Sequence, residues 1–351
     1  MSTAARWYAS REAVKKLIPI AGSALNSVID GYIESASAEI ETQTYRRFIP
    51  YTAAKSYPWP QRDALRSYVL HLDEDLLSVS SLTRDGTDVT DIAAADYFLE
   101  PVNSPPYQKI EIDLSSSAYF GAKDTHQRAI VVTGSWGYSG ATKAAGTVAS
   151  GLAADAAATS CVCSDGSLID VGDTLLIGTE QLFVSERATV DTTANLNDTL
   201  TANLSDTGVT VTDGTQVKAG EVILIESERM LVESVSGNVL TVIRGYDGST
   251  LAAHSGALDV YAYRTLTVVR GVNGTTAAVH ANSTAIAKYA PEADIVLLCK
   301  ALAIGMYEQG RSGWTGQLGG GEAAIEGRMS NLRNLREDVV RRYRRKVIGA
   351  V

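Results

Sequence analysis

The residues best suited to chemistry in this 351-residue chain include two histidines that occupy equivalent positions. His254 and His280 each end a copy of the motif RGxxGxTxAxH. A protein metal site needs three or four converging ligands with fixed supporting partners, and the other two histidines fall in a different region of the chain. We therefore expect no metal here, and we expect each imidazole to bond the backbone of its own turn.

The cysteines are the second candidate, because Cys161 and Cys163 are spaced like a ligand pair. An internal repeat places Val209 and Val211 at their positions, so they are interpreted as small buried hydrophobic residues. With Cys299 they make an odd number, which argues against a disulfide framework and is typical of a reducing cytosol.

Catalytic motifs are absent from the sequence, which contains no GxxxxGK[ST], HExxH, GxSxG or CxxC pattern. We therefore expect no catalytic residues, no cofactor and no enzyme activity. Hydrophobic residues make up 45% of the chain and charged residues 20%, which indicates a folded protein rather than a disordered one. No run of about 18 apolar residues is present, so we expect no membrane span.

Two internal repeats organise the middle third of the chain. Residues 161–186 align without gaps on 209–234 with 7 of 26 positions identical, and 240–263 align on 266–289 with 10 of 24 identical. Aspartate, asparagine and glycine recur at the turns, where they supply positive φ angles between short strands. The repeats predict an all-β insertion, built as one or two small sandwiches or barrels. The small residues of 140–160 predict a linker leading into it.

Helices are predicted at both ends of the chain from apolar residues spaced three and four apart. Ser10 is expected to cap a short helix, and a longer helix is expected to start at Ser23, with one apolar face formed by Leu25, Val28, Ile29, Tyr32, Ile33, Ala36 and Ile40. Pro291, Glu292 and Asp294 suit the start of another helix that Gly310 ends. A glycine-rich joint then precedes a terminal helix, which we expect to be mobile.

Between Ile49 and Tyr138 the hydrophobic period changes to two, which predicts four or five short antiparallel strands. The last of them is AIVVTGSWGY, beginning at Ala129. Trp59 and Trp136 are interpreted as core or interface residues, because no polar cluster accompanies either of them.

Charge is distributed unevenly along the chain. Residues 328–351 carry eight cations and two acids, 8 − 2 = +6, so a net charge of −9 leaves −9 − 6 = −15 on the remainder. The basic tail could dock on an acidic protein ring, neutralise DNA phosphates, or simply solvate a terminal helix. Protein docking is favoured, because the acidic body repels a duplex and only Tyr343 is aromatic within the tail.

Taken together, these segments resemble the head-tail connector (adaptor, or head-completion) proteins of long-tailed bacteriophages. The resemblance lies in IESASAEIETQTYRRF, IVVTGSWGY and APEADIVLLCKALA, over residues 9–138 and 289–310. The units RGYDGSTLAAH and RGVNGTTAAVH also resemble extensions found in some family members.

The resemblance implies a structural virion protein made in the host cytoplasm and located in the neck of the virion. Such adaptors form a ring, commonly a dodecamer, under the portal protein. The ring extends the viral DNA channel, through which double-stranded DNA passes without sequence-specific binding, and it presents a surface to a stopper, tail-completion or tail terminator protein. The C-terminal segment would dock on the portal, through Leu332, Leu335, Val339, Arg341, Arg342, Tyr343, Arg344, Arg345 and Lys346.

The expected fold class is α+β, with a helical connector core, a small antiparallel sheet and the inserted β-repeat domain. The expected divisions are a connector core over 1–139 completed by 290–312, the insertion over 140–289, and the joint and basic helix over 313–351. The alternative function is a β-rich binding protein, such as a tail-associated or carbohydrate-binding module, with Tyr246, Tyr261, Tyr263 and Tyr289 as candidate sugar platforms. A DNA-binding packaging factor is a third possibility, and steep salt dependence of duplex binding would identify it.

Overall fold

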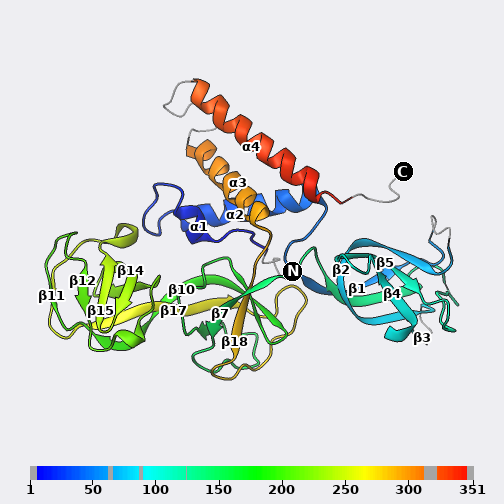
Figure 1. Ribbon diagram of the computed structural model, residues 1–351, viewed down its shortest axis with the longest axis horizontal. Coiled ribbons are helices and arrows are strands. Elements are labelled where there is room, and N and C mark those ends of the chain that lie inside the picture. The colour runs from blue at the N-terminus through cyan, green and yellow to red at the C-terminus, as the bar shows by residue number, and fades with distance from the viewer. Residues whose placement is uncertain (1–5, 62–65, 87–89, 124, 312–321, 346–351) are drawn as a thin grey trace.

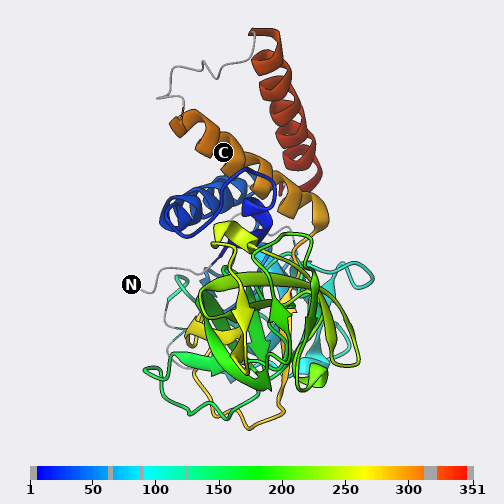
Figure 2. The same cartoon turned by 90° about the vertical axis from the view of Figure 1, so that its left-hand side faces the viewer.

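The computed structural model describes residues 6–61, 66–86, 90–123, 125–311 and 322–345. The protein is mostly β, with 38% strand and 21% helix, and two large antiparallel sheets dominate it. Three β lobes lie in a row along the long axis, and the helices form a layer on one side of that row (Figures 1 and 2). The α+β expectation gave the helices too much weight, because they form a minor layer and a helical core is not evident.

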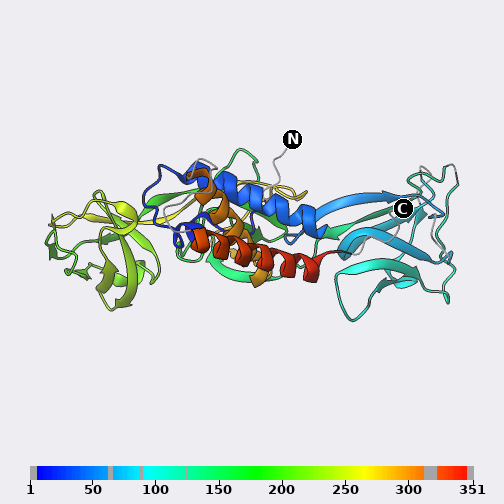
Figure 3. The same cartoon turned by 90° about the horizontal axis from the view of Figure 1, so that it is seen from above.

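Four α-helices from the two ends of the chain pack together: α1 Arg11–Lys15, α2 Asn26–Thr44, α3 Ala293–Arg311 and α4 Glu322–Tyr343. Ser10 caps α1 as predicted, since its hydroxyl accepts a hydrogen bond from the backbone N–H of Ala13 at 3.3 Å. Helices α2 and α3 lie against each other, and Figure 3 shows α4 beside them. Their shared apolar cluster includes Ile29, Ile33, Ile40, Ile295, Leu298 and Leu302. None of the described helices combines the length and apolar character that a bilayer crossing requires.

The predicted apolar face of the long helix is correct except at its start. Helix α2 begins at Asn26 rather than Ser23, and Leu25 and Val28 are exposed. The buried side chains come from the following turns, where α3 covers the helix.

The first β lobe is a six-stranded antiparallel sheet in the order β1-β6-β2-β5-β4, with β3 paired to β2. Its strands are β1 Tyr51–Tyr57, β2 Val69–Arg84, β3 Thr90–Asp91, β4 Tyr97–Glu100, β5 Tyr107–Ile112 and β6 Ile130–Trp136. Strand β2 is longer than the short strands predicted for this region, and register shifts interrupt it. Trp59 and Trp136 are buried in the core of this lobe, as predicted.

The other two lobes share a ten-stranded antiparallel sheet in the order β12-β15-β14-β13-β17-β10-β9-β18-β7, with β8 paired to β17. Its strands are β7 Thr142–Thr147, β8 Ser160–Val162, β9 Thr174–Ile177, β10 Glu180–Asn195, β12 Gly208–Thr210, β13 Val222–Ile225, β14 Glu228–Ser236, β15 Val239–Ile243, β17 Asp259–Val269 and β18 Ala285–Tyr289. A separate pair joins β11 Thr199–Leu200 to β16 His254–Ser255. The long strands β10 and β17 run from one lobe into the other (Figure 1).

The repeats are nested, so that each lobe combines one copy of each repeat. We call the central lobe unit A (residues 161–186 and 266–289) and the outer lobe unit B (209–263). Cys161 pairs with Leu266 in unit A as Val209 pairs with Leu240 in unit B. Each unit has its own apolar cluster, although the two units share one sheet.

The expected linker at 140–160 is wrong in its first part. Strand β7 pairs with β18 at the edge of the unit A sheet, from Thr142 opposite Tyr289 to Thr147 opposite Ala285. Ala145 and Val148 are completely buried in the unit A cluster. These small residues suit a strand that packs closely against its neighbours.

Candidate functional site

Each of the two equivalent histidines bonds a buried glutamate. In unit A, Arg270 donates to Glu180 through Nε at 2.6 Å and Nη2 at 2.7 Å, and His280 Nε2 lies 2.7 Å from the same carboxylate. The backbone N–H groups of Gly271 and Ala278 complete the shell. We call these three side chains the unit A triad.

Unit B repeats this arrangement with Glu228, Arg244 and His254, the unit B triad. Arg244 donates to Glu228 at 2.7 and 2.9 Å, and His254 Nε2 lies 2.9 Å from it. Unit B adds a second carboxylate, because His254 Nδ1 lies 2.8 Å from Glu226, where the repeat alignment places Gly178 in unit A.

The prediction that each imidazole bonds turn backbone is therefore wrong. The reason is that Glu180 and Glu228, which are equivalent in the repeat alignment, reach under the turns from neighbouring strands. That identity was visible in the sequence, but a strand-end glutamate is normally solvated. In the described part of the chain, no group of three or more histidine, cysteine or acidic side chains could hold a metal ion.

The triads hold ionised carboxylates in the interior. Burial alone would raise the pKa of Glu180 and Glu228, but hydrogen bonds from Arg270 and Arg244, backbone N–H groups and the histidines lower it to about 2. The oxygens of both carboxylates accept hydrogen bonds from these donors. Because the donors belong to the RGxxG turns or to the residues that follow them, the arrangement stabilises the turns.

Cys161 and Cys163 are buried in the unit A cluster, as predicted. Burial raises the pKa of both thiols to about 11, which keeps them protonated and unreactive near neutral pH.

The turn inside each RGxxG motif attaches its unit to the rest of the protein. In unit B, the backbone N–H of Gly22 donates to the carbonyl of Asp247 at 2.9 Å, and Lys15 lies 3.0 Å from the Asp247 carboxylate. In unit A, the N–H of Thr52 in β1 donates to the carbonyl of Asn273 at 2.8 Å. Equivalent turns therefore contact the helical layer in one case and the six-stranded sheet in the other.

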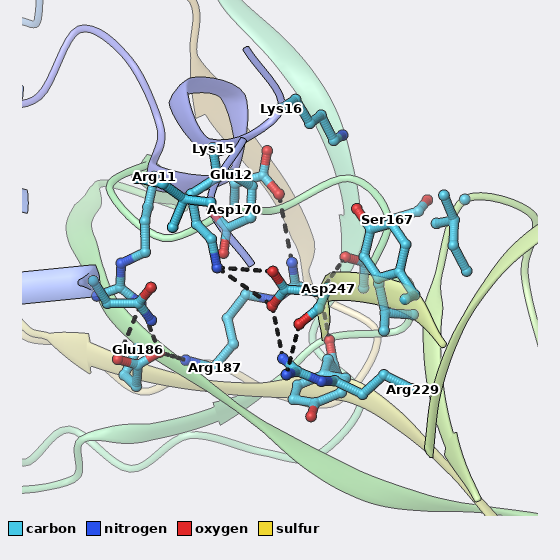
Figure 4. Close-up of a pocket in the computed structure, with 18 residues that line it drawn as sticks. Arg11, Glu12, Lys15, Lys16, Ser167, Asp170, Glu186, Arg187, Arg229 and Asp247 are labelled. Atoms are coloured by element: carbon cyan, nitrogen blue, oxygen red, sulfur yellow. Dashed lines mark hydrogen bonds and ion pairs between the residues drawn. The ribbon is translucent and has the colours of Figure 1, made fainter. Parts of the chain in front are cut away.

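Helix α1 lies where both units meet, and it forms one wall of a pocket of about 370 Å³ (Figure 4). The N–H of Arg11 donates to the carbonyl of Val171 at 3.0 Å, and the Glu12 carboxylate accepts from the N–H of Val171 at 2.9 Å. Units A and B supply the other walls, which include Asp170 and Tyr246. The sequence did not indicate this pocket, because α1 lies more than 100 residues from both units in the chain.

Glu12 should make this junction sensitive to pH. Burial, with the nearby Asp170 carboxylate, raises the pKa of Glu12 to about 7. Because the folded-state pKa lies above the unfolded value, the folded protein binds the proton more tightly, and stability falls as pH rises from about 4.5 to about 7. Over this pH range the free energy of unfolding should fall by on the order of 1–3 kcal/mol. We expect Glu12→Gln to remove this pH dependence in thermal unfolding measured from pH 4 to 8. An unchanged slope in the variant would contradict the assignment.

The apolar face of α4 packs inside the protein. Val339 and Tyr343 are buried in the helical cluster, and Leu332 and Leu335 are partly buried against it. The hydroxyl of Tyr343 donates to Asp294 at 2.8 Å. These four side chains, which the sequence assigned to portal docking, are thus brought together against α2 and α3. The glycine-rich joint lies outside the described residues.

The basic residues of the tail divide into an internal and an exposed group. Arg345 is buried, where it donates to the carbonyl of Leu72 at 2.8 Å and lies 3.3 Å from Asp75. Arg46 also pairs with Asp75, at 2.6 Å.

The exposed arginines among the predicted docking residues are Arg341, Arg342 and Arg344, and Arg333 and Arg336, earlier in α4, are exposed as well. Arg342 pairs with Asp294 at 2.5 Å while most of its side chain stays in solvent. The ninth predicted docking residue, Lys346, lies outside the described residues.

The candidate sugar platforms are separated by the fold. Tyr246 and Tyr263 line the pocket beside α1. Tyr289 packs against the helical cluster and accepts from Gln181 at 3.2 Å, while Tyr261 donates to Asp259 at 3.4 Å.

Comparison with protein-family models, with curated proteins and with solved structures found no match.

Proposed function

We propose that this chain is a structural virion protein, a head-tail adaptor that forms a ring under the portal of a long-tailed bacteriophage. The finer fold assignment belongs to this proposal: the helices and the six-stranded sheet are the connector elements, and units A and B are the insertion. The ring would extend the DNA channel and provide the surface on which a stopper or tail terminator protein assembles.

The observation that carries the proposal is an exposed group of arginines at the end of an anchored helix. Helix α4 packs through Val339 and Tyr343, so Arg341, Arg342 and Arg344 are held in place at the surface. Cations carried on an anchored helix suit docking on an acidic protein ring, because little backbone ordering remains to oppose binding.

The packing of α3 on α2 gives further support. These helices lie on either side of residues 51–289 in the chain, yet they share one apolar cluster. An insertion between them can therefore be accommodated without separating the connector helices, which is what the family resemblance requires. The net charge of about −15 outside the tail is suited to a channel that DNA passes without adhering.

The proposal is tested by mass photometry of the protein alone and with the portal ring encoded beside it. We expect a complex with about one copy per portal subunit. Simultaneous Arg341→Glu, Arg342→Glu and Arg344→Glu changes should weaken association about tenfold or more, because they replace attraction with repulsion at the docking surface.

A control variant reverses three exposed cations elsewhere, Arg128, Lys143 and Lys218. It should bind the portal like the original protein, and both variants should keep the original thermal midpoint. A protein that stays monomeric in the presence of the portal would refute the adaptor function. Portal binding that is equally strong in both variants would refute the role of the three arginines.

A further inference from the structure

Unit A contains a site that a tryptophan side chain fills. Phe183 and Val272 form a small apolar cluster, and Trp7 packs against it from outside the repeats. The ring centroids of Trp7 and Phe183 lie 5.3 Å apart in an edge-to-face arrangement. Gly172 allows the indole ring to come close, because a Cβ atom at that position would lie 2.3 Å from Cε3 of Trp7.

The pocket beside α1 lies at the corresponding place in unit B. The repeat alignments give each unit A residue around Trp7 a counterpart that lines this pocket: Gly220 for Gly172, Leu231 for Phe183, and Tyr246 for Val272. The atoms nearest to an added Cβ at Gly220 belong to the small side chain of Ser167, at 3.1 Å (Figure 4). The volume of about 370 Å³ falls within the range of roughly 300–1,000 Å³ that is typical of ligand sites.

The backbone around the two sites is also equivalent. The N–H of Gly172 donates to the carbonyl of Val184 at 2.8 Å, and the N–H of Gly220 donates to the carbonyl of Val232 at 2.7 Å. The φ angles of the two glycines are +98° and +87°. Unit B therefore repeats the backbone frame that holds an indole ring in unit A.

The polar residues beside the two sites differ in charge. In unit A, Asn273 donates to the side chain of Gln181 at 2.9 Å. Their counterparts in unit B are Asp247 and Arg229, which form an ion pair at 2.7 Å and line the pocket. A guanidinium group attracts the face of an aromatic ring, and an uncharged ring leaves the ion pair intact.

We propose that this pocket binds the tryptophan side chain of a peptide segment from a partner protein. The indole ring would contact Leu231 and Tyr246 in the way that Trp7 contacts their counterparts in unit A. Tryptophan suits such a pocket, because it buries a large apolar area and often anchors protein interfaces. The site does not include the arginines of α4 that are proposed to dock on the portal, so the two proposals stand or fall separately.

The test uses the full chain and N-acetyltryptophanamide, which carries the indole ring on an uncharged, peptide-like backbone. N-acetylleucinamide is the non-aromatic comparison, and free tryptophan represents a metabolite rather than a peptide. Binding is followed by titration in saturation-transfer NMR. We expect N-acetyltryptophanamide to bind with a dissociation constant on the order of 1 mM or tighter, and N-acetylleucinamide to bind at least about tenfold more weakly.

Leu231→Trp fills the pocket from within unit B and should weaken binding at least about tenfold. Val239→Trp is the matched control, because Val239 is exposed on the same sheet and does not line the pocket. The control should retain the original affinity. Absence of N-acetyltryptophanamide binding, binding of free tryptophan alone, or equal binding by the Leu231→Trp protein would each overturn the proposal.

Trp7→Ala tests whether the two sites are equivalent. The variant should have a lower thermal midpoint, since it opens the site in unit A. N-acetyltryptophanamide should raise the midpoint of this variant more than that of the original protein, because two sites rather than one would then bind it. Equal shifts in the two proteins would refute the equivalence on which the proposal rests.

Discussion

Replacing Glu228 with glutamine is expected to lower the free energy of unfolding by about 3–5 kcal/mol. Glu228 is fully buried, and its carboxylate receives two hydrogen bonds from Arg244 and one from His254. The amide would leave the Arg244 guanidinium as an uncompensated charge in the interior. Urea unfolding and hydrogen exchange over β13 to β15 would measure the loss.

The same carboxylate should make the stability of unit B depend on pH in the acidic range. Because the folded-state pKa of Glu228 is lowered to about 2, the folded protein binds the proton less tightly than the unfolded chain. Its contribution is fully present above about pH 4.5 and is lost as the pH falls towards 2. The Glu228→Gln protein should lack this part of the acid transition, which unfolding measured between pH 2 and 7 would show.

Glu226 provides a matched control beside the same triad. It contacts the other nitrogen of His254, but 56% of its side chain is exposed to solvent. An exposed ion pair contributes roughly 0–1 kcal/mol, so Glu226→Gln should be nearly neutral. Equal losses in the two variants would show that burial of the Glu228–Arg244 pair is not the source of the stability.

The sequence predicted features that depend on local periodicity and missed those that depend on distant partners. The repeats, the cap at Ser10 and the buried cysteines were predicted correctly, because each follows from neighbouring residues or from alignment of the chain with itself. The triads were missed although Glu180 and Glu228 were among the seven identities of the first repeat. Arg270, which makes Glu180 a buried partner, lies 90 residues further along.

The same dependence on distant partners explains the error at β7 and the packing of the tail helix that was not predicted. Residues 142–147 lack large apolar side chains, so nothing local marks them as a strand, and their pairing depends on β18. In the tail, the sequence predicted a terminal helix, whose apolar face includes Val339 and Tyr343. It could not show that α2 and α3 of the same chain cover that face.

The second large effect is expected at Gly274, in the turn that attaches unit A to the six-stranded sheet. Gly274 has a φ of +79°, and a Cβ atom there would lie 2.1 Å from the carbonyl oxygen of Thr52. Gly274→Ala should therefore displace the turn and break the bond from the Thr52 N–H to the Asn273 carbonyl. We expect faster hydrogen exchange at Thr52 and a loss of about 2–5 kcal/mol, combining left-handed strain with overpacking.

Gly237 separates these two contributions, because it has a φ of +59° and an added Cβ would meet no atom within 4 Å. Gly237→Ala should cost only the backbone strain, about 1–2 kcal/mol, and should leave exchange at Thr52 unchanged. The excess loss in Gly274→Ala then measures the close approach of the turn to β1. If the two variants lose the same stability and Thr52 stays protected in both, the turn does not hold unit A against the sheet. If the excess appears, unit A is fixed to the six-stranded sheet at this turn.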